Sequence, residues 1–218
     1  MNKTIRVTGK GILHVKPDTT RLTIILSGKT KEYASTMELS ARDTQCLREI
    51  LQEQGFNKTD LKTLSFDISP CHEGYYDKNK NWKQRFIGYE YSHRCKLEFP
   101  SDHDVLGKTL YALSHSSVHP EFSISYTVHD PEAVKNELLG KAVSDAVAKA
   151  RVLTAAADMT LGDILNIDYS WGKVDIEVTP LQDMKMGCCE EAEQTLDLDI
   201  EPDDAELTDT VTVVWEIK

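Results

Sequence analysis

VTGKGILHVKPDTTRLTIIL, Val7 to Leu26, carries two glycines two positions apart and a Lys-Pro-Asp in its middle. Apolar and polar residues alternate on both sides of Pro17, which is the period of a β-strand. A glycine-rich loop that binds phosphate would lead directly into a helix, and no helical pattern follows these glycines. Because proline favours the second position of a tight turn, the stretch predicts two strands joined at Pro17 and Asp18. Gly9 and Gly11 on the apolar face indicate either a closely packed neighbouring element or a bulge.

The composition is that of a globular, acidic protein. The 218 residues are 40% hydrophobic, which is enough for one large domain or two small ones. The 25 basic and 36 acidic residues give a net charge of -11, so we expect no nucleic-acid partner and repulsion from anionic lipid. No apolar run reaches the roughly 18 residues of a membrane span, and Met1 leads directly into strand-like sequence, so we expect a cytoplasmic protein. Five cysteines, an odd number, are typical of reduced thiols.

Helical and strand periods follow one another along the chain. Helices are expected over residues 31–55, from Ser101 or Asp102 to Leu113, and over Pro131 to Asp158. Further strands are expected at Leu64–Ile68, Ile87–Phe99, Phe122–Val128, Leu165–Trp171 and Val211–Ile217, with residues 71–85 as the polar tip of a hairpin. This order predicts an α+β fold of antiparallel sheets backed by helices, either as one domain over 1–218 or as two related strand-helix-strand lobes, about 1–100 and 101–218.

The helix over Pro131 to Asp158 carries an unbroken stripe of small residues, many of them alanine. Alanine lets a helix axis approach its neighbour closely, so we expect this face to pack on a sheet that contains the strands around Phe122 and Ile167. Replacing Ala146 with leucine should overpack such a contact.

Several short motifs, taken in order, resemble the SIMPL-domain proteins, a family named after a mammalian kinase-interacting member and widespread in bacteria. They are VTGKG at Val7–Gly11, the Lys-Pro-Asp at Lys16–Asp18, the pair Gly88 and Tyr89, the alanine-rich segment Lys141–Ile167, and the closing VTVVWEIK. The resemblance spans nearly the whole chain. It implies an α+β fold of antiparallel sheets backed by helices, frequent assembly into homo-oligomers, and no agreed catalytic activity.

The chain departs from this pattern in two ways. Many bacterial relatives are periplasmic or associated with the cell envelope, whereas this sequence shows no export signal. Residues 186–209 form an acidic segment where relatives have a variable loop, and its last twenty residues hold ten carboxylates and no lysine or arginine. A calcium loop would need a glycine and a closing glutamate that this segment lacks, so we interpret it as a solvated connector.

Two groups of residues are candidates for chemistry. Cys71 and His72 lie beside the hairpin tip, and His93 and Cys95 lie on the strand expected to pair with it, so the four residues together are candidate ligands of a metal ion or parts of a thiol-dependent enzyme. The alternative interpretation is ordinary packing, because His93 and Cys95 fall on an apolar face. The adjacent Cys188 and Cys189 precede a run of acids, which disfavours a reactive thiolate and indicates incidental loop thiols.

The distinctive residues are therefore those of strands, turns and close packing. They favour a non-enzymatic protein that acts by self-assembly and by binding a protein partner, without a cofactor. The alternative is a metal-dependent or thiol-dependent enzyme built on Cys71, His72, His93 and Cys95. For assembly, the candidate contact is the hairpin tip, where Tyr75, Tyr76 and Trp82 stand among polar residues; the competing interpretation is an exposed aromatic loop without a partner.

Overall fold

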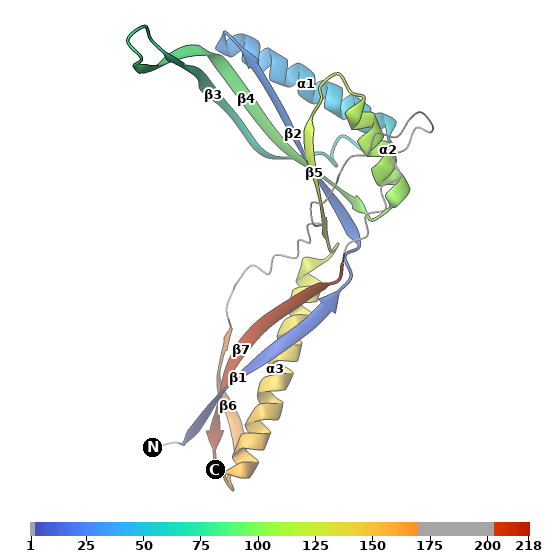
Figure 1. The fold of residues 1–218 in the computed structure, drawn as a ribbon. Helices are drawn as coiled ribbons and strands as arrows, with labels where there is room; N and C mark the ends of the chain where they lie inside the picture. The colour runs from blue at the N-terminus through green and yellow to red at the C-terminus, as the bar shows by residue number, and fades with distance from the viewer. Residues whose placement is uncertain (1–2, 170–202) are drawn as a thin grey trace. The chain divides into compact units, whose positions relative to one another are not determined.

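The structure is a computed structural model that describes residues 3–169 and 203–218 (Figure 1). Cys188, Cys189, Trp171 and the acidic residues before 203 lie outside the described residues. The described chain runs through seven strands and three helices and divides into two compact units. The terminal unit holds the chain up to Asp18, the chain from Thr127 to the end of the sixth strand, and the last strand; the central unit holds Thr19 to Tyr126. The α+β class predicted from the sequence, with antiparallel sheets backed by helices, is confirmed.

The terminal unit is a three-stranded antiparallel sheet covered on one face by a long helix (Figure 1). Its strands lie in the order β1 (Thr4–Val15), β7 (Ala205–Ile217) and β6 (Leu161–Tyr169), and its helix is α3 (Pro131–Ala156). The two ends of the chain therefore pair with each other, with Val7 opposite Val213. Asp130 begins α3 by accepting a hydrogen bond from the backbone N–H of Ala133, as expected for an N-cap aspartate before a proline.

The helix and β1 approach each other so closely that only glycine fits between them. A Cβ atom at Gly9 would lie 2.0 Å from the carbonyl oxygen of Ala142 and 2.4 Å from the backbone nitrogen of Ala146. At Gly11 the nearest atom would be the carbonyl oxygen of Leu138, at 2.3 Å. Of the two explanations for these glycines, close packing is therefore correct, and no register shift interrupts the β1 and β7 pairing.

The central unit is a four-stranded sheet with two helices (Figure 1). Its strands lie in the order β3 (Lys62–Tyr76), β4 (Trp82–Pro100), β2 (Thr19–Thr30) and β5 (Glu121–Thr127). The helices are α1 (Tyr33–Glu53) and α2 (His103–Ser114), and Asp102 caps α2 by accepting from the N–H groups of Asp104 and Val105. The core between helices and sheet consists mainly of leucine and isoleucine from β2, β4 and both helices, including Leu22, Ile24, Leu47, Leu97 and Leu110.

Three features differ from the sequence-based predictions. The strand of Phe122, β5, belongs to the sheet of the central unit, so α3 packs on β1 and β7 and not on that strand. The compact units do not follow the predicted lobes 1–100 and 101–218, because β1 pairs with β7 from the other end of the chain. The segment 71–85 is mostly strand, because β3 extends to Tyr76 and β4 begins at Trp82. Within the described chain, none of the helices has the length and apolar character that crossing a bilayer requires.

Candidate functional site

The pair of strands β3 and β4 forms a hairpin that extends beyond the rest of its sheet (Figure 1). The pairing of β2 with β4 stops at Thr30 opposite Tyr89, whereas β3 pairs with β4 as far as Tyr76 opposite Trp82. The end of the hairpin is therefore a two-stranded ribbon. Because side chains alternate between the two faces of a strand, the ribbon presents side chains on both faces.

Large apolar side chains are exposed along the whole hairpin. Tyr76 is 69% exposed, Trp82 59% and Tyr75 42%. Single exposed apolar residues are ordinary on a protein surface, but six large ones on one hairpin are more than its structure requires, and concentrations of exposed apolar side chains are typical of interaction sites. The group, called the hairpin surface below, consists of Leu64, Phe66, Tyr75, Tyr76, Trp82 and Phe86.

The aromatic rings at the end of the hairpin hold one another in place. The rings of Tyr76 and Trp82, opposite each other on the two strands, meet edge to face with centroids 5.0 Å apart. The indole of Trp82 also crosses over Gly74, where a Cβ atom would lie 2.1 Å from its Cζ2 atom. Any side chain at position 74 would therefore displace the indole. Tyr75 points to the other face of the ribbon, so both faces carry an aromatic residue.

A second group of rings continues toward the body of the sheet. Phe86 contacts both Tyr89 and His72, with ring centroids 5.2 Å and 5.8 Å away. Tyr89 in turn contacts Tyr33 of α1 edge to face at 5.4 Å. Edge-to-face pairs of this kind add stability beyond the area they bury. These contacts orient the exposed rings before any partner is bound.

Asp77 organises the turn that joins the two strands. Its Oδ1 atom accepts hydrogen bonds from the backbone N–H groups of Asn79 at 2.8 Å and Asn81 at 2.9 Å. Its Oδ2 atom lies 3.0 Å from Nζ of Lys83. The bond from Asn81 and the lysine lower the pKa of the Asp77 carboxyl, because they favour its charged form. The backbone of Lys80 has φ 60, a left-handed conformation that this hydrogen-bonded turn maintains.

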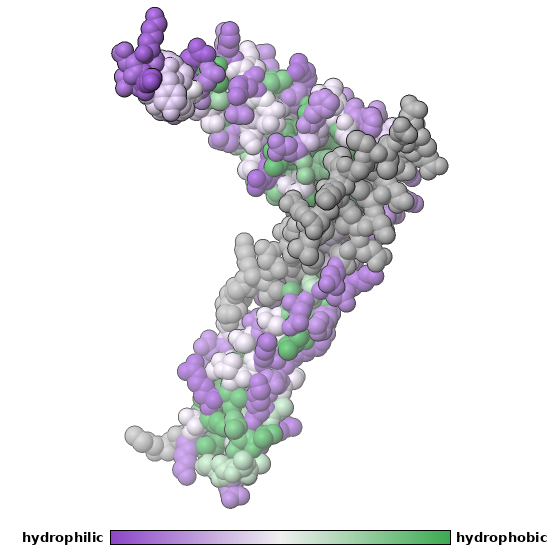
Figure 2. Space-filling view, in the orientation of Figure 1, coloured by the Kyte–Doolittle hydropathy of each residue, from purple (hydrophilic) through white to green (hydrophobic). Residues whose placement is uncertain are grey.

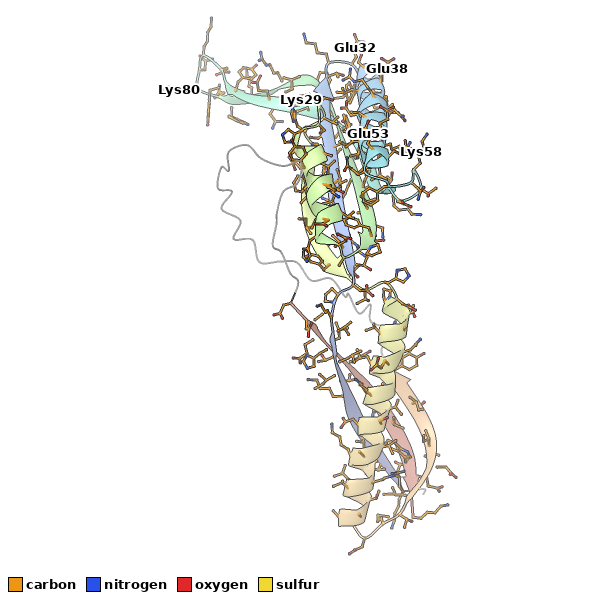
Figure 3. All side chains as sticks on the ribbon, turned by 90° about the vertical axis from the view of Figure 1, so that its right-hand side faces the viewer. Lys29, Glu32, Glu38, Glu53, Lys58 and Lys80 are labelled. Atoms are coloured by element: carbon orange, nitrogen blue, oxygen red, sulfur yellow. The ribbon has the colours of Figure 1, made fainter. Side chains whose placement is uncertain are left out.

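The end of the hairpin is rich in cations, unlike the chain as a whole. Lys78, Lys80, Lys83 and Arg85 fall within eight residues, and Figure 3 shows Lys80 at the extremity of the hairpin. Lys83 pairs with Asp77, and Arg85 pairs with Glu73 at 2.6 Å. Figure 2 shows strongly hydrophilic residues at this end. The aromatic rings therefore stand among charged and amide side chains, which is the usual make-up of a protein contact surface.

The histidine and the cysteine on β4 are buried under α1. Thr44 lies 3.0 Å from Nδ1 of His93, and the hydroxyl of Thr63 lies 2.9 Å from its Nε2. The Sγ atom of Cys95 is 3.2 Å from the same Nε2. Burial, and secondarily the nearby Arg48, lower the pKa of His93, whereas burial raises the pKa of Cys95. Both ring nitrogens of the histidine thus have polar neighbours within the protein.

The structure does not bring the four candidate ligands together. Cys71 pairs with Gly88 and His72 with Phe86, whereas His93 pairs with Phe66, five residues away from Cys71 along β3. Five residues of a strand span about 17 Å, too far for a shared metal ion. Cys71 instead lies beside Lys29 and raises the pKa of that amine through a hydrogen bond. Within the residues that the structure describes, no three potential ligands are grouped to hold a metal ion.

The sequence indicates the aromatic residues of the tip but not the rest of the hairpin surface. Its alternation predicts Leu64 and Phe66 as ordinary strand residues, yet both are exposed on β3, the edge strand of its sheet. The exposure of Phe86 follows from the projection of the hairpin beyond β2. In the sequence, these exposures are indicated only by the unusual length of the two alternating segments on either side of the polar turn.

Comparison with known proteins identifies the family of the chain. The profile of the SIMPL family, described as a protein of unknown function (DUF541), matches residues 5–215. Two relatives are 26 kDa periplasmic immunogenic proteins, from Brucella abortus (strain S19) and from Brucella melitensis biotype 1 (strain ATCC 23456). Each is 30% identical over 165 residues, which cover 75% of this chain. The matched region spans 65% of the length of these relatives. The chain therefore belongs to the SIMPL family.

Proposed function

We propose that this protein acts without catalysis, by assembling with copies of itself and by binding a protein partner, and that the hairpin surface forms the contact. The observation that carries the proposal is the exposure of six large apolar side chains on one hairpin. Tyrosine and tryptophan are favoured at protein interfaces because they bury a large area and keep a polar group for hydrogen bonding. The ring contacts that orient Trp82 and Phe86 reduce the entropy lost on binding.

The area that the hairpin exposes indicates how much of it must take part. Tyr75, Tyr76 and Trp82 together expose on the order of 300 Å², if a free aromatic side chain presents about 200 Å². At about 25 cal/mol per Å², burying this area is favourable by roughly 8 kcal/mol, which is comparable to the loss of rotational and translational freedom on association. A stable interface buries about 800 Å² on each partner. The proposed contact therefore includes Leu64, Phe66 and Phe86 as well as the tip.

Light scattering coupled to size exclusion tests the proposal over a range of micromolar concentrations. The wild type is expected to be a homo-oligomer, and the variant Tyr75→Ser/Tyr76→Ser/Trp82→Ser is expected to be a smaller species with an unchanged circular dichroism spectrum. A matched control is Phe122→Ser/Val152→Ser/Leu153→Ser, which removes three exposed large apolar residues outside the hairpin and its ring contacts. A monomeric wild type, or an oligomer that the hairpin variant leaves intact, would rule out this contact.

The cellular location is a separate proposal. The Brucella relatives are named as periplasmic proteins, whereas the odd number of cysteines is typical of reduced thiols in the cytoplasm. We propose the cytoplasmic location, with Cys46, Cys71 and Cys95 as free thiols. Cell fractionation, with a cytosolic and a periplasmic enzyme as markers, tests it directly, and recovery in the periplasmic fraction would overturn it.

A further inference from the structure

We infer that the end of the hairpin docks onto the acidic segment Glu190–Asp204, which precedes β7, of a second copy of this chain. The inference rests on the proposed self-assembly and specifies what the hairpin contacts. The docking surface consists of the aromatic residues at the tip together with the lysines of its turn. The evidence for the occupant is charge complementarity between two segments of the same chain.

The turn presents positive charge that the hairpin does not neutralise. Lys83 and Arg85 form ion pairs with Asp77 and Glu73 of the same hairpin. For Lys78 and Lys80, by contrast, the described residues provide no ion pair. These two lysines stand on a turn that Asp77 holds with two backbone hydrogen bonds, next to the exposed Tyr76. These hydrogen bonds hold the backbone of the turn, so the points from which the two lysine side chains extend keep a fixed spacing from Tyr76 that a partner can match.

The segment Glu190–Asp204 has the composition that this surface requires. Its fifteen residues include eight carboxylates and no lysine or arginine, so it carries most of the net charge of -11. Its middle part, Leu196–Glu201, reads LDLDIE and alternates apolar residues with acids. Apolar side chains suit the rings of Tyr76 and Trp82, and carboxylates suit the two lysines. Just before β7, where the described chain resumes, Asp203 and Asp204 are exposed.

The acidic segment of a second copy is the occupant that local charge complementarity favours. The net charge of -11 opposes the approach of phosphate, of anionic lipid and of a second copy alike, so the contact between the lysines and the carboxylates must outweigh this repulsion. A copy of the same chain offers the acidic segment at the same concentration as the lysines. Such a contact joins different surfaces of the two copies, a head-to-tail arrangement that closes into a ring or extends as a chain.

Charge exchange between the two segments tests the inference on the full-length protein. One variant carries Lys78→Glu/Lys80→Asp, with aspartate at position 80 because it tolerates a left-handed backbone better than most residues. The other carries Asp197→Lys/Asp199→Lys. Each variant alone is expected to weaken self-association by on the order of tenfold in about 0.15 M salt. An equimolar mixture of the two is expected to recover much of the loss, because each copy then meets a complementary one.

Lys58→Glu/Lys108→Glu is the matched control, since it changes the net charge equally at two exposed lysines outside the hairpin. It is expected to leave self-association close to that of the wild type. Oligomers that the aromatic triple variant disrupts, but that both charge variants leave unchanged, would overturn the inference while preserving the proposed function. So would a loss with the lysine variant alone, which would indicate another acidic partner. A wild type that is monomeric throughout would refute the proposed function itself.

Discussion

Replacing Gly9 with alanine is the most direct test of how β1 and α3 fit together. The added Cβ atom would lie 2.0 Å from the carbonyl oxygen of Ala142, whereas ordinary van der Waals contacts begin near 3.4 Å. Relieving this contact alone requires a shift of about 1.4 Å between the helix and the strand. A second contact, at 2.4 Å, involves the backbone nitrogen of Ala146, so no side chain can rotate away from either one.

Overpacking of a core costs roughly 1 to 3 kcal/mol when side chains can adjust. Here both opposing atoms belong to the backbone of a helix, so we expect Gly9→Ala to destabilise the terminal unit by about 3 kcal/mol or more. The displaced helix would also lose contacts between Ala142, Ala146 and the buried face of β7. The strand itself gains little, because the preference for alanine over glycine within a strand or helix is only about 0.5 to 1 kcal/mol.

Urea denaturation followed by tryptophan fluorescence measures this cost, since Trp215 is buried in the terminal unit. Circular dichroism at the same urea concentrations reports the central unit as well. Gly140→Ala is the matched control: it makes the same substitution in α3 itself, where no atom lies within 4 Å of the new Cβ. We expect it to stabilise the protein by about 0.5 to 1 kcal/mol. An unfolding midpoint of Gly9→Ala equal to that of the wild type would refute the close approach of β1 and α3.

Three further substitutions test other parts of the structure. Ala146→Leu, at a fully buried position of the same contact, should cost at least roughly 1 to 3 kcal/mol; an unchanged melting temperature would mean that the alanine face is not packed. The pKa of His93 is lowered in the folded protein, so below its ordinary value of 6.5 the unfolded state binds more protons and stability should fall as the pH decreases. His93→Gln removes this dependence, and equal slopes for variant and wild type in urea titrations between about pH 7 and pH 5 would contradict the assignment. Asp77→Ala removes two backbone hydrogen bonds from the hairpin turn and should raise the amide hydrogen-exchange rates of Asn79 and Asn81, with those of Glu73 serving as the internal reference.

The sequence identified most elements because their signals are local. The caps at Asp102 and Asp130 each depend on the hydrogen bonds of a few neighbouring residues. The tight turn predicted at Pro17 does not form, because β1 and β2 belong to different sheets and residues 16–18 only connect them. Gly55, two residues after the end of α1, has a left-handed φ of 92, a conformation that often ends a helix. Alternation likewise placed Val7, Val211 and Val213 on the buried face of their strands. The extent of the hairpin tip is not predicted correctly, because regular alternation does not show where a long strand ends.

Residues at the candidate surface were only partly predictable for a related reason. Aromatic residues among polar ones indicate a contact surface at Tyr75, Tyr76 and Trp82, and all three are exposed. The pattern around Phe66 is the same whether its strand lies in the centre of a sheet or at the edge. Periodicity gives the face of a residue and not the number of strands beside it. The separation of Cys71 from His93 depends likewise on the register of β3 and β4.

The sequence by itself determined the α+β class and the helices to within about two residues at their ends, and it limited Gly9 and Gly11 to two explanations, a close contact or a bulge. The tertiary structure decided which elements share a sheet: β1 pairs with β7 across nearly the whole chain, and β5 joins β2 and not the sheet beneath α3. Local patterns arise from hydrogen bonds and burial within a few residues, so they are present in any short window of sequence. Pairing between strands far apart in the sequence depends on how whole sheet and helix faces pack together, and a short stretch of sequence carries no information about that packing.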